Sequence, residues 1–99
     1  MVDLAKITGF EWDEGNCRKN DKHHVSIAET EQVFFNMPLL LLADSKHSEQ
    51  EPRFHGLGKT DQGRLLHITF TLRHQGKAIR VISARDMHKK ERTIYEQVT

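Results

Sequence analysis

Cysteine is almost absent from this chain of 99 residues, in which Cys17 is the only thiol. One cysteine excludes an intramolecular disulfide framework and a zinc site built from several thiolates. Long apolar runs are missing as well, because the most conspicuous one, residues 39–42, is far shorter than the roughly 20 residues of a membrane-spanning helix. The first ten residues contain an early Asp3 and no continuous apolar segment. They do not resemble a secretory signal, so we expect a cytoplasmic protein without membrane contact.

Signatures of metal and nucleophilic catalysis are also missing. The seven histidines have no H-E-x-x-H spacing and no cysteine partner. The stretch GLGKT at residues 56–60 resembles the end of a phosphate-binding loop, but Arg53 stands where its leading glycine belongs. No G-x-S-x-G motif is present, and Ser83 is better explained as a cap than as a nucleophile. We therefore expect neither a metal nor an organic cofactor.

The composition that is present suits one folded domain, with 36% hydrophobic and 29% charged residues. A chain of this length supports one modest core, so we expect a single domain over residues 1–99. Residues 1–51 hold five Lys or Arg against ten Asp or Glu, whereas residues 52–99 hold ten against four. The net charge of +1 therefore conceals a dipole. A basic segment in a nearly neutral domain suits a phosphate-binding face, although neutralisation of one half by the other explains the same counts.

Two helices are predicted in the acidic half. Residues 7–12 alternate as a short strand would, and Asp13 can cap a very polar helix over residues 14–23. Ser26 and Glu29 form the pattern of a capping box, which starts a second helix that ends near Asn36. The buried stripe of this second helix is predicted to consist of Ile27, Ala28, Val33, Phe34 and Phe35.

Strands are predicted after residue 38. Residues 39–43, 52–60, 64–73 and 78–85 read as four strands, joined in part by short glycine-containing links. A last helix follows Arg85. The expected fold class is α+β, with an antiparallel sheet of about four strands, two N-terminal helices and one C-terminal helix. The core is expected to include Phe34, Phe35, Ile68, Phe70, Ile82, Ile94 and Tyr95.

Arginines dominate the chemistry of the basic half. A metal-free ribonuclease needs a base for the 2′-hydroxyl, guanidinium groups that hold the phosphate, and an acid for the leaving oxygen. Arg80 lies inside a predicted strand, so it either meets a carboxylate or faces a functional groove. Surface ion pairs explain Arg18, Arg73 and Arg92 better. A non-catalytic nucleic-acid-binding regulator and an interaction subunit remain open as alternatives, because neither needs an acid or a base.

Several segments resemble the BrnT family: FEWDEGN, KHHVS, TEQVFFN, EPRFHGLGKTDQGRLL and IRVISARDMHKKERTIYE, which together span residues 10–96. The resemblance implies a RelE-like fold and the toxin of a type II toxin-antitoxin pair. It further implies a metal-independent ribonuclease that inhibits translation by cleaving RNA. The implied partner is a BrnA-like antitoxin, which neutralises the toxin in a hetero-oligomer and alone contacts operator DNA.

This chain departs from the family pattern in two places. The usual K-H-G-V is Lys22-His23-His24-Val25 here, and the interval between Trp12 and Lys22 is about one residue short. The loss of glycine matters if the backbone at residue 24 needs a positive φ, which histidine tolerates less well.

The polar positions of the family-like motifs define the expected site. Arg64, Arg80 and Arg85 should line one groove, with Arg85 as the main phosphate stabiliser beside the amide end of the last helix. His23 is the expected base or acid. The complete expected set is Arg64, Arg80, Arg85, His23 and Tyr95 as catalytic residues, with Lys22, Arg53, Lys59 and Lys89 as RNA-binding residues.

Overall fold

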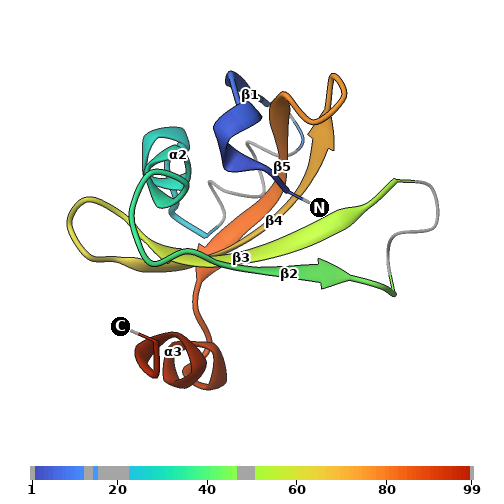
Figure 1. The fold of residues 1–99 in the computed structure, drawn as a ribbon. Coiled ribbons are helices and arrows are strands. Elements are labelled where there is room, and N and C mark those ends of the chain that lie inside the picture. Colours follow the sequence, from blue (N-terminus) through green and yellow to red (C-terminus); the bar gives the residue numbers. More distant parts are fainter. Residues whose placement is uncertain (1, 13–14, 16–22, 47–50, 99) are drawn as a thin grey trace.

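The computed structural model describes residues 2–12, 15, 23–46 and 51–98. Five strands form one sheet among these residues, and a helix lies on each face of it (Figure 1). The predicted helix over residues 14–23 lies almost entirely outside the described residues. The elements in chain order are η1 (Leu4–Lys6), β1 (Gly9–Glu11), α2 (Ile27–Val33), β2 (Leu40–Asp44), β3 (Arg53–Lys59), β4 (Leu65–Arg73), β5 (Ala78–Asp86) and α3 (Lys89–Glu96).

The sheet has the order β1-β5-β4-β3-β2 and is mixed. Strands β2 to β5 form the predicted antiparallel meander. The short strand predicted within residues 7–12 is present as β1, but it joins the sheet as a fifth strand parallel to β5, so the prediction of about four antiparallel strands was incomplete. A strand of three residues gives too short an alternation to show its partner, and a parallel pair leaves no hairpin signal in the sequence.

Local chemistry explains the ends of these elements. The Ser26 hydroxyl accepts from the Glu29 amide and the Glu29 carboxylate accepts from the Ser26 amide, so the predicted capping box is present. His74 and Gln75 both have a positive φ in the tight turn between β4 and β5, and Gly76 follows them with a φ of 87°. Between Thr69 and Phe70 the pairing of β4 with β5 shifts by a residue, which is a β-bulge.

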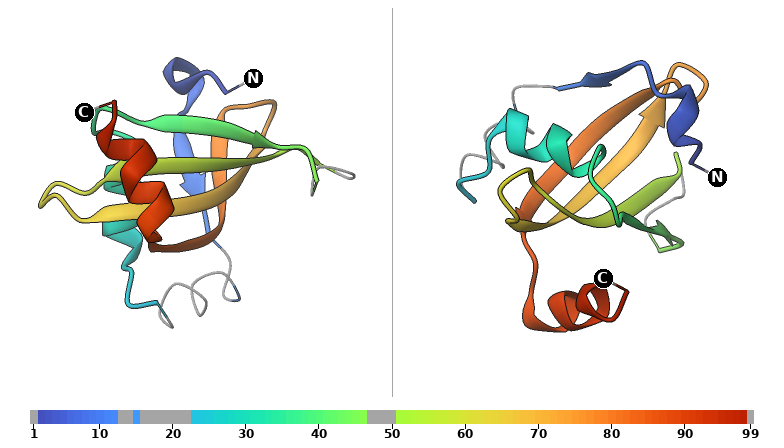
Figure 2. Two further views of the ribbon diagram at one scale, coloured as in Figure 1. Left: turned by 90° about the horizontal axis from the view of Figure 1, so that it is seen from below. Right: turned by 60° about the vertical axis from the view of Figure 1, so that its left-hand side comes forward.

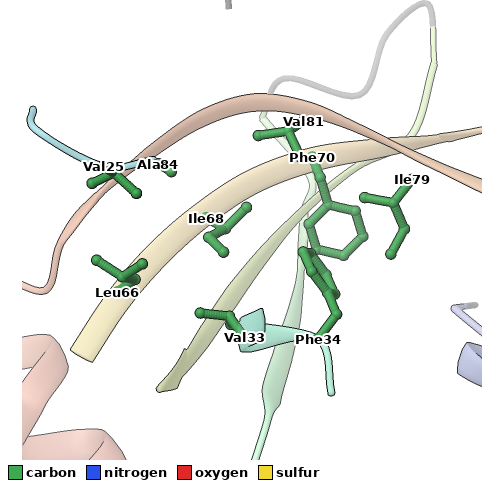
Figure 3. Packing of buried hydrophobic residues seen from close by; sticks show 9 residues of the cluster. All are labelled: Val25, Val33, Phe34, Leu66, Ile68, Phe70, Ile79, Val81 and Ala84. Carbon is green, nitrogen blue, oxygen red and sulfur yellow. The ribbon is translucent and has the colours of Figure 1, made fainter. Parts of the chain in front are cut away.

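The apolar core lies between α2 and the sheet. Figure 3 shows Val33 and Phe34 of the α2 segment directed at Ile68 and Phe70 of β4. The Phe34 and Phe70 rings meet edge to face, with centroids 5.1 Å apart. α2 approaches β3 so closely that a Cβ on Gly58 would lie 2.6 Å from Val33 Cγ1, so glycine is required there.

The opposite face of the sheet is covered only in part. α3 crosses one end of the strands, and no described helix covers the rest of that face (Figure 2). A small second cluster holds α3 in place and consists of Leu57, Met87 and Tyr95, with Leu40 and Leu65 against it. Burial raises the pKa of Tyr95, whose hydroxyl donates to the Pro38 carbonyl oxygen at 2.7 Å.

Three of the predicted core positions differ from the structure. Phe34, Ile68, Phe70 and Tyr95 are buried as predicted. Phe35 is 75% exposed and Ile94 is 50% exposed, whereas Ile82 is half-buried at the bulge. In α2 the buried residues are Thr30 and Val33, whereas Ile27 and Ala28 of the predicted buried stripe are exposed, because the helix ends at Val33 and contacts the sheet mainly through its last turn. No described helix has the length and apolar character to cross a membrane.

Candidate active site

Polar side chains occupy the part of the sheet that α3 leaves uncovered. Successive residues of a strand point to opposite faces, so the residues that pair across strands form rows on one face. The strand register places three such rows on the α3 side of the sheet, called here the polar face. The first row is Asp44, Arg53, Thr71, Arg80 and Glu11, the middle row is Leu42, His55, Thr69 and Ser83, and the third row is Leu40, Leu57, His67 and Arg85.

His55 stands in the middle row and is held at both ring nitrogens. Its Nε2 lies 2.9 Å from Asp44 Oδ2, and its Nδ1 lies 3.1 Å from Thr69 Oγ1. An ionised carboxylate only accepts hydrogen bonds, so Nε2 carries the proton in this arrangement. In the neutral ring Nδ1 is then the acceptor, and the Thr69 hydroxyl donates to it.

His67 and Arg85 occupy the row next to α3. The His67 ring packs against the His55 ring with centroids 4.9 Å apart, and its Nδ1 is buried without a hydrogen-bond partner among the described residues. Burial lowers the pKa of His67 to about 4, and the positive charge of Arg85 contributes to that shift. His67 is therefore neutral near pH 7, and its Nε2 lies 3.8 Å from Glu91 Oε2.

The Arg85 guanidinium is held by the last helix. It donates to both carboxylate oxygens of Glu91, at 2.8 and 3.0 Å, and to the Asp86 carbonyl oxygen at 3.0 Å. These hydrogen bonds lower the pKa of Glu91 to about 2, against the opposing effect of burial. Within the described part of the chain, three of the five N–H donors of Arg85 are used, so the group retains capacity for a phosphate.

Positive charge lies on both sides of the middle row. Arg53 and Arg80 belong to one neighbouring row, and Arg85 belongs to the other. Alternate residues of a strand are about 6.7 Å apart, so the backbone positions of these arginines lie about one row away from Thr69 and Ser83. Three arginines around one region suit a phosphodiester, because a guanidinium binds phosphate oxygens in pairs.

Arg64 belongs to a different cluster, on the α2 side of the sheet. Its side chain donates to Asp86 at 2.8 and 3.2 Å, to Glu29 at 3.0 Å, and to the carbonyl oxygens of His24 and His23 at 2.8 and 3.4 Å. All five N–H donors are engaged. These bonds, with those to Asp86 foremost, raise the pKa of Arg64 and lower that of Asp86.

The backbone at His24 has the unusual conformation that glycine favours. Its φ is 56°, which is positive, so the histidine that replaces the usual glycine here adopts a backbone conformation that favours glycine. The His24 carbonyl oxygen is the one that accepts from Arg64 Nη1. Arg64 thus ties down a strained turn at the start of the α2 segment, where His23 is exposed beside Asp86.

Residues 12–91 match a family model described as ribonuclease toxin, BrnT, of type II toxin-antitoxin system. The chain belongs to the BrnT family. A crystal structure of the Brucella abortus ribonuclease toxin BrnT has a TM-score of 0.61 to this fold at 19% identity, covering 83% of this chain and 99% of that one. At that identity the likeness establishes the fold alone. Comparison with curated proteins gave no match.

The structure of this BrnT-family chain brings together only some of the predicted site residues. Arg80 and Arg85 share the polar face with Arg53, whereas Arg64 lies on the other face with His23 nearby. Tyr95 is 1% exposed and its hydroxyl donates to the Pro38 carbonyl oxygen, so Tyr95 is a core residue. The single groove that was predicted to hold all of them is therefore divided by the sheet.

The predicted lysines are more scattered. Lys59 ends β3, and Lys89 is an exposed residue that begins α3. Lys22 lies outside the described residues.

Sequence reasoning overlooked His55, His67, Asp44 and Glu91. The alternation of Arg53 with His55, and of His67 with Thr69, is visible in the sequence as a polar strand face. That alternation could have identified the polar face, but only the pairing register shows that His55 and His67 are neighbours.

Proposed function

We propose that this BrnT-family chain is a ribonuclease that cleaves RNA with the arginines of the polar face. The observation that carries the proposal is the placement of Arg53, Arg80 and Arg85 around the row of His55, Thr69 and Ser83. The family description, ribonuclease toxin of a type II toxin-antitoxin system, supports the same reading. Cleavage of this kind uses the 2′-hydroxyl of the RNA as the nucleophile, and the arginines stabilise the charge that builds on the phosphate.

The partner proposed for this chain is a BrnA-like antitoxin, with operator DNA reached only through that antitoxin. Production of the chain should arrest growth and degrade RNA, and co-production of the adjacent antitoxin should prevent both. The proposed cytoplasmic location follows from an RNA substrate and an inhibited translation machinery. A sequence-specific gel shift of operator DNA by the isolated chain would favour the regulator reading instead.

The decisive test compares Arg85→Ala with Arg92→Ala in RNA cleavage by the purified chain. The first variant lacks the guanidinium group that is proposed to stabilise the phosphate in the transition state, so cleavage should slow by about 10² to 10³-fold. Arg92 is exposed on α3, and its removal deletes the same charge from a position outside the three rows, so the rate should stay within a few-fold.

Three results would count against this proposal. A wild-type chain that binds RNA without cutting it would be a binding protein, and equal rates for the two folded variants would place the chemistry elsewhere. Binding of RNA is checked at several salt concentrations, since phosphate contacts weaken as salt rises. Thermal unfolding of both variants must match the wild type before the rates are compared, and a collapsed Arg85→Ala variant would mean that the arginine is structural.

A further inference from the structure

His55 and Asp44 form a hydrogen-bonded pair on the polar face, and the phosphate-binding role proposed for the arginines does not explain it. Asp44 ends β2 and His55 lies in the middle of β3, and the two side chains meet across the strand pair at 2.9 Å. The Asp44 side chain is only 10% exposed, whereas that of His55 is 29% exposed. Solvent therefore reaches the imidazole, and the carboxylate stands behind it.

We propose that His55 is the general base of the reaction on the polar face, and that Asp44 is the residue that positions it. The inference rests on the proposed ribonuclease function. Asp44 fixes the proton on Nε2, so the lone pair of the neutral ring is on Nδ1, on the side of Thr69. A substrate hydroxyl reaches Nδ1 by replacing the Thr69 hydroxyl, which is the group that satisfies this nitrogen in the free protein.

The location of His55 suits this role. Thr69 and Ser83 are its neighbours in the middle row, and the arginine rows flank that row on both sides. A phosphate bound above Thr69 and Ser83 would have its ribose beside His55 Nδ1. General bases need this hydrogen-bond reach to the proton they remove.

The proposed step balances as follows. His55 Nδ1 takes the proton of the 2′-hydroxyl while the O2′–P bond forms and the P–O5′ bond breaks. The leaving 5′-oxygen takes a proton from water, which yields a 2′,3′-cyclic phosphate and a 5′-hydroxyl. The imidazolium then returns its proton to solvent. Asp44 stabilises the imidazolium with its negative charge throughout.

The charged and titratable groups around His55 come from each neighbouring element. Asp44 faces it from β2 and His67 from β4, with Arg53 on β3 itself and Arg80 and Arg85 on β5. Glu91 of α3 faces His67 and Arg85, one layer further away. The Asp44 carboxylate is the anion in direct contact with His55, and it accepts the hydrogen bond that orients the ring.

The test measures single-turnover cleavage of one RNA whose cleavage site has been mapped, and of the same RNA with sulfur in place of the leaving 5′-oxygen. His55→Ala should slow both reactions by about 10² to 10⁴-fold, since the 2′-hydroxyl must lose its proton whichever atom leaves. Added imidazole should restore part of the rate. His88→Asn, which changes an exposed histidine outside the rows, should leave both rates within about twofold.

Asp44→Asn tests the positioning role. Loss of the carboxylate acceptor should lower the cleavage rate, and it should also release the proton from Nε2, so that both neutral tautomers of the His55 ring become populated. The NMR shifts of the two ring nitrogens report the tautomer without any need for activity, and a wild-type tautomer in Asp44→Asn would refute the positioning role.

Two outcomes would overturn the proposal. Restoration of the His55→Ala rate by the sulfur substrate would make His55 an acid, and a His55→Ala rate near that of the wild type would leave it no role in proton transfer. In either case Arg85→Ala remains slow if the proposed function holds, whereas a wild-type chain that cleaves no RNA refutes the proposed function itself.

Discussion

Two arginine–carboxylate clusters flank the end of β5, one on each face of the sheet. They differ in how many N–H donors of the arginine are hydrogen-bonded. On the α2 face, every N–H donor of Arg64 is hydrogen-bonded to Asp86, Glu29 or one of two backbone carbonyl oxygens. On the α3 face, Arg85 is bonded to Glu91 and one carbonyl oxygen and retains donors. A saturated arginine stabilises the fold, whereas a partly used one on a polar face can bind a ligand.

The largest effect is expected from removal of the saturated arginine. Arg64→Met removes five hydrogen bonds, to Asp86, Glu29 and the carbonyl oxygens of His23 and His24, and should cost about 2 to 3 kcal/mol of unfolding free energy. Arg85→Met removes three hydrogen bonds and should cost clearly less, since Glu29 and Glu91 each retain a bond from a backbone amide. Urea unfolding of both variants measures the difference. Equal costs would show that saturation of the donors does not separate the two clusters.

Acid should weaken the α3 face before the α2 face. The pKa of His67 is lowered to about 4 in the fold, so the unfolded chain binds its proton first as the pH falls from about 6.5. The contribution of His67 to stability is complete above that pH and is lost progressively on the way to pH 4. Glu91, with a pKa lowered to about 2, adds a further loss below pH 4.5.

The control for this pH dependence is His67→Gln. Unfolding free energies measured between pH 7 and 4.5 should fall less steeply in the variant than in the wild type. A variant with the wild-type slope would mean that His67 does not enter the fold as a neutral ring.

The smallest effect concerns the turn that Arg64 holds. His24→Gly removes the cost of a positive φ on a residue with a Cβ, partly offset by greater freedom of the unfolded chain, and should stabilise the fold by about 0.5 to 1 kcal/mol. His23→Gly, at the neighbouring position, should give no such gain. Thermal unfolding of the two variants measures this difference, and destabilisation by His24→Gly would show that the histidine side chain makes a compensating contact.

Patterns that depend on near neighbours could be read from the sequence. The capping box at Ser26, the alternation along β4 and the glycine-containing turn before β5 were all predicted and are present. The motifs in the sequence also indicate the BrnT family, and the family match over residues 12–91 confirms it. Features that depend on register and packing were missed, because the spacing of residues along the chain does not contain them.

The site shows the same limit. Arg64 and Arg85 look alike in the sequence as polar residues at strand ends, and only their hydrogen-bond partners distinguish them. His55 and Asp44 are 11 residues apart, with nothing in the sequence to mark them as a pair until β2 is aligned with β3. The exposure of Phe35 likewise depends on where α2 ends on the sheet, which periodicity alone does not define.

The parallel pairing of β1 with β5 has a consequence for synthesis on the ribosome. Glu11 pairs with Arg80, so the first strand to be translated stays without its partner until the last strand has been made. Arg80 and Arg85 both belong to that last strand, and contacts this distant in sequence form late and slowly. A nascent chain that ends before β5 lacks two of the three arginines of the polar face. The proposed phosphate-binding arginines are therefore completed only when that strand emerges from the ribosome.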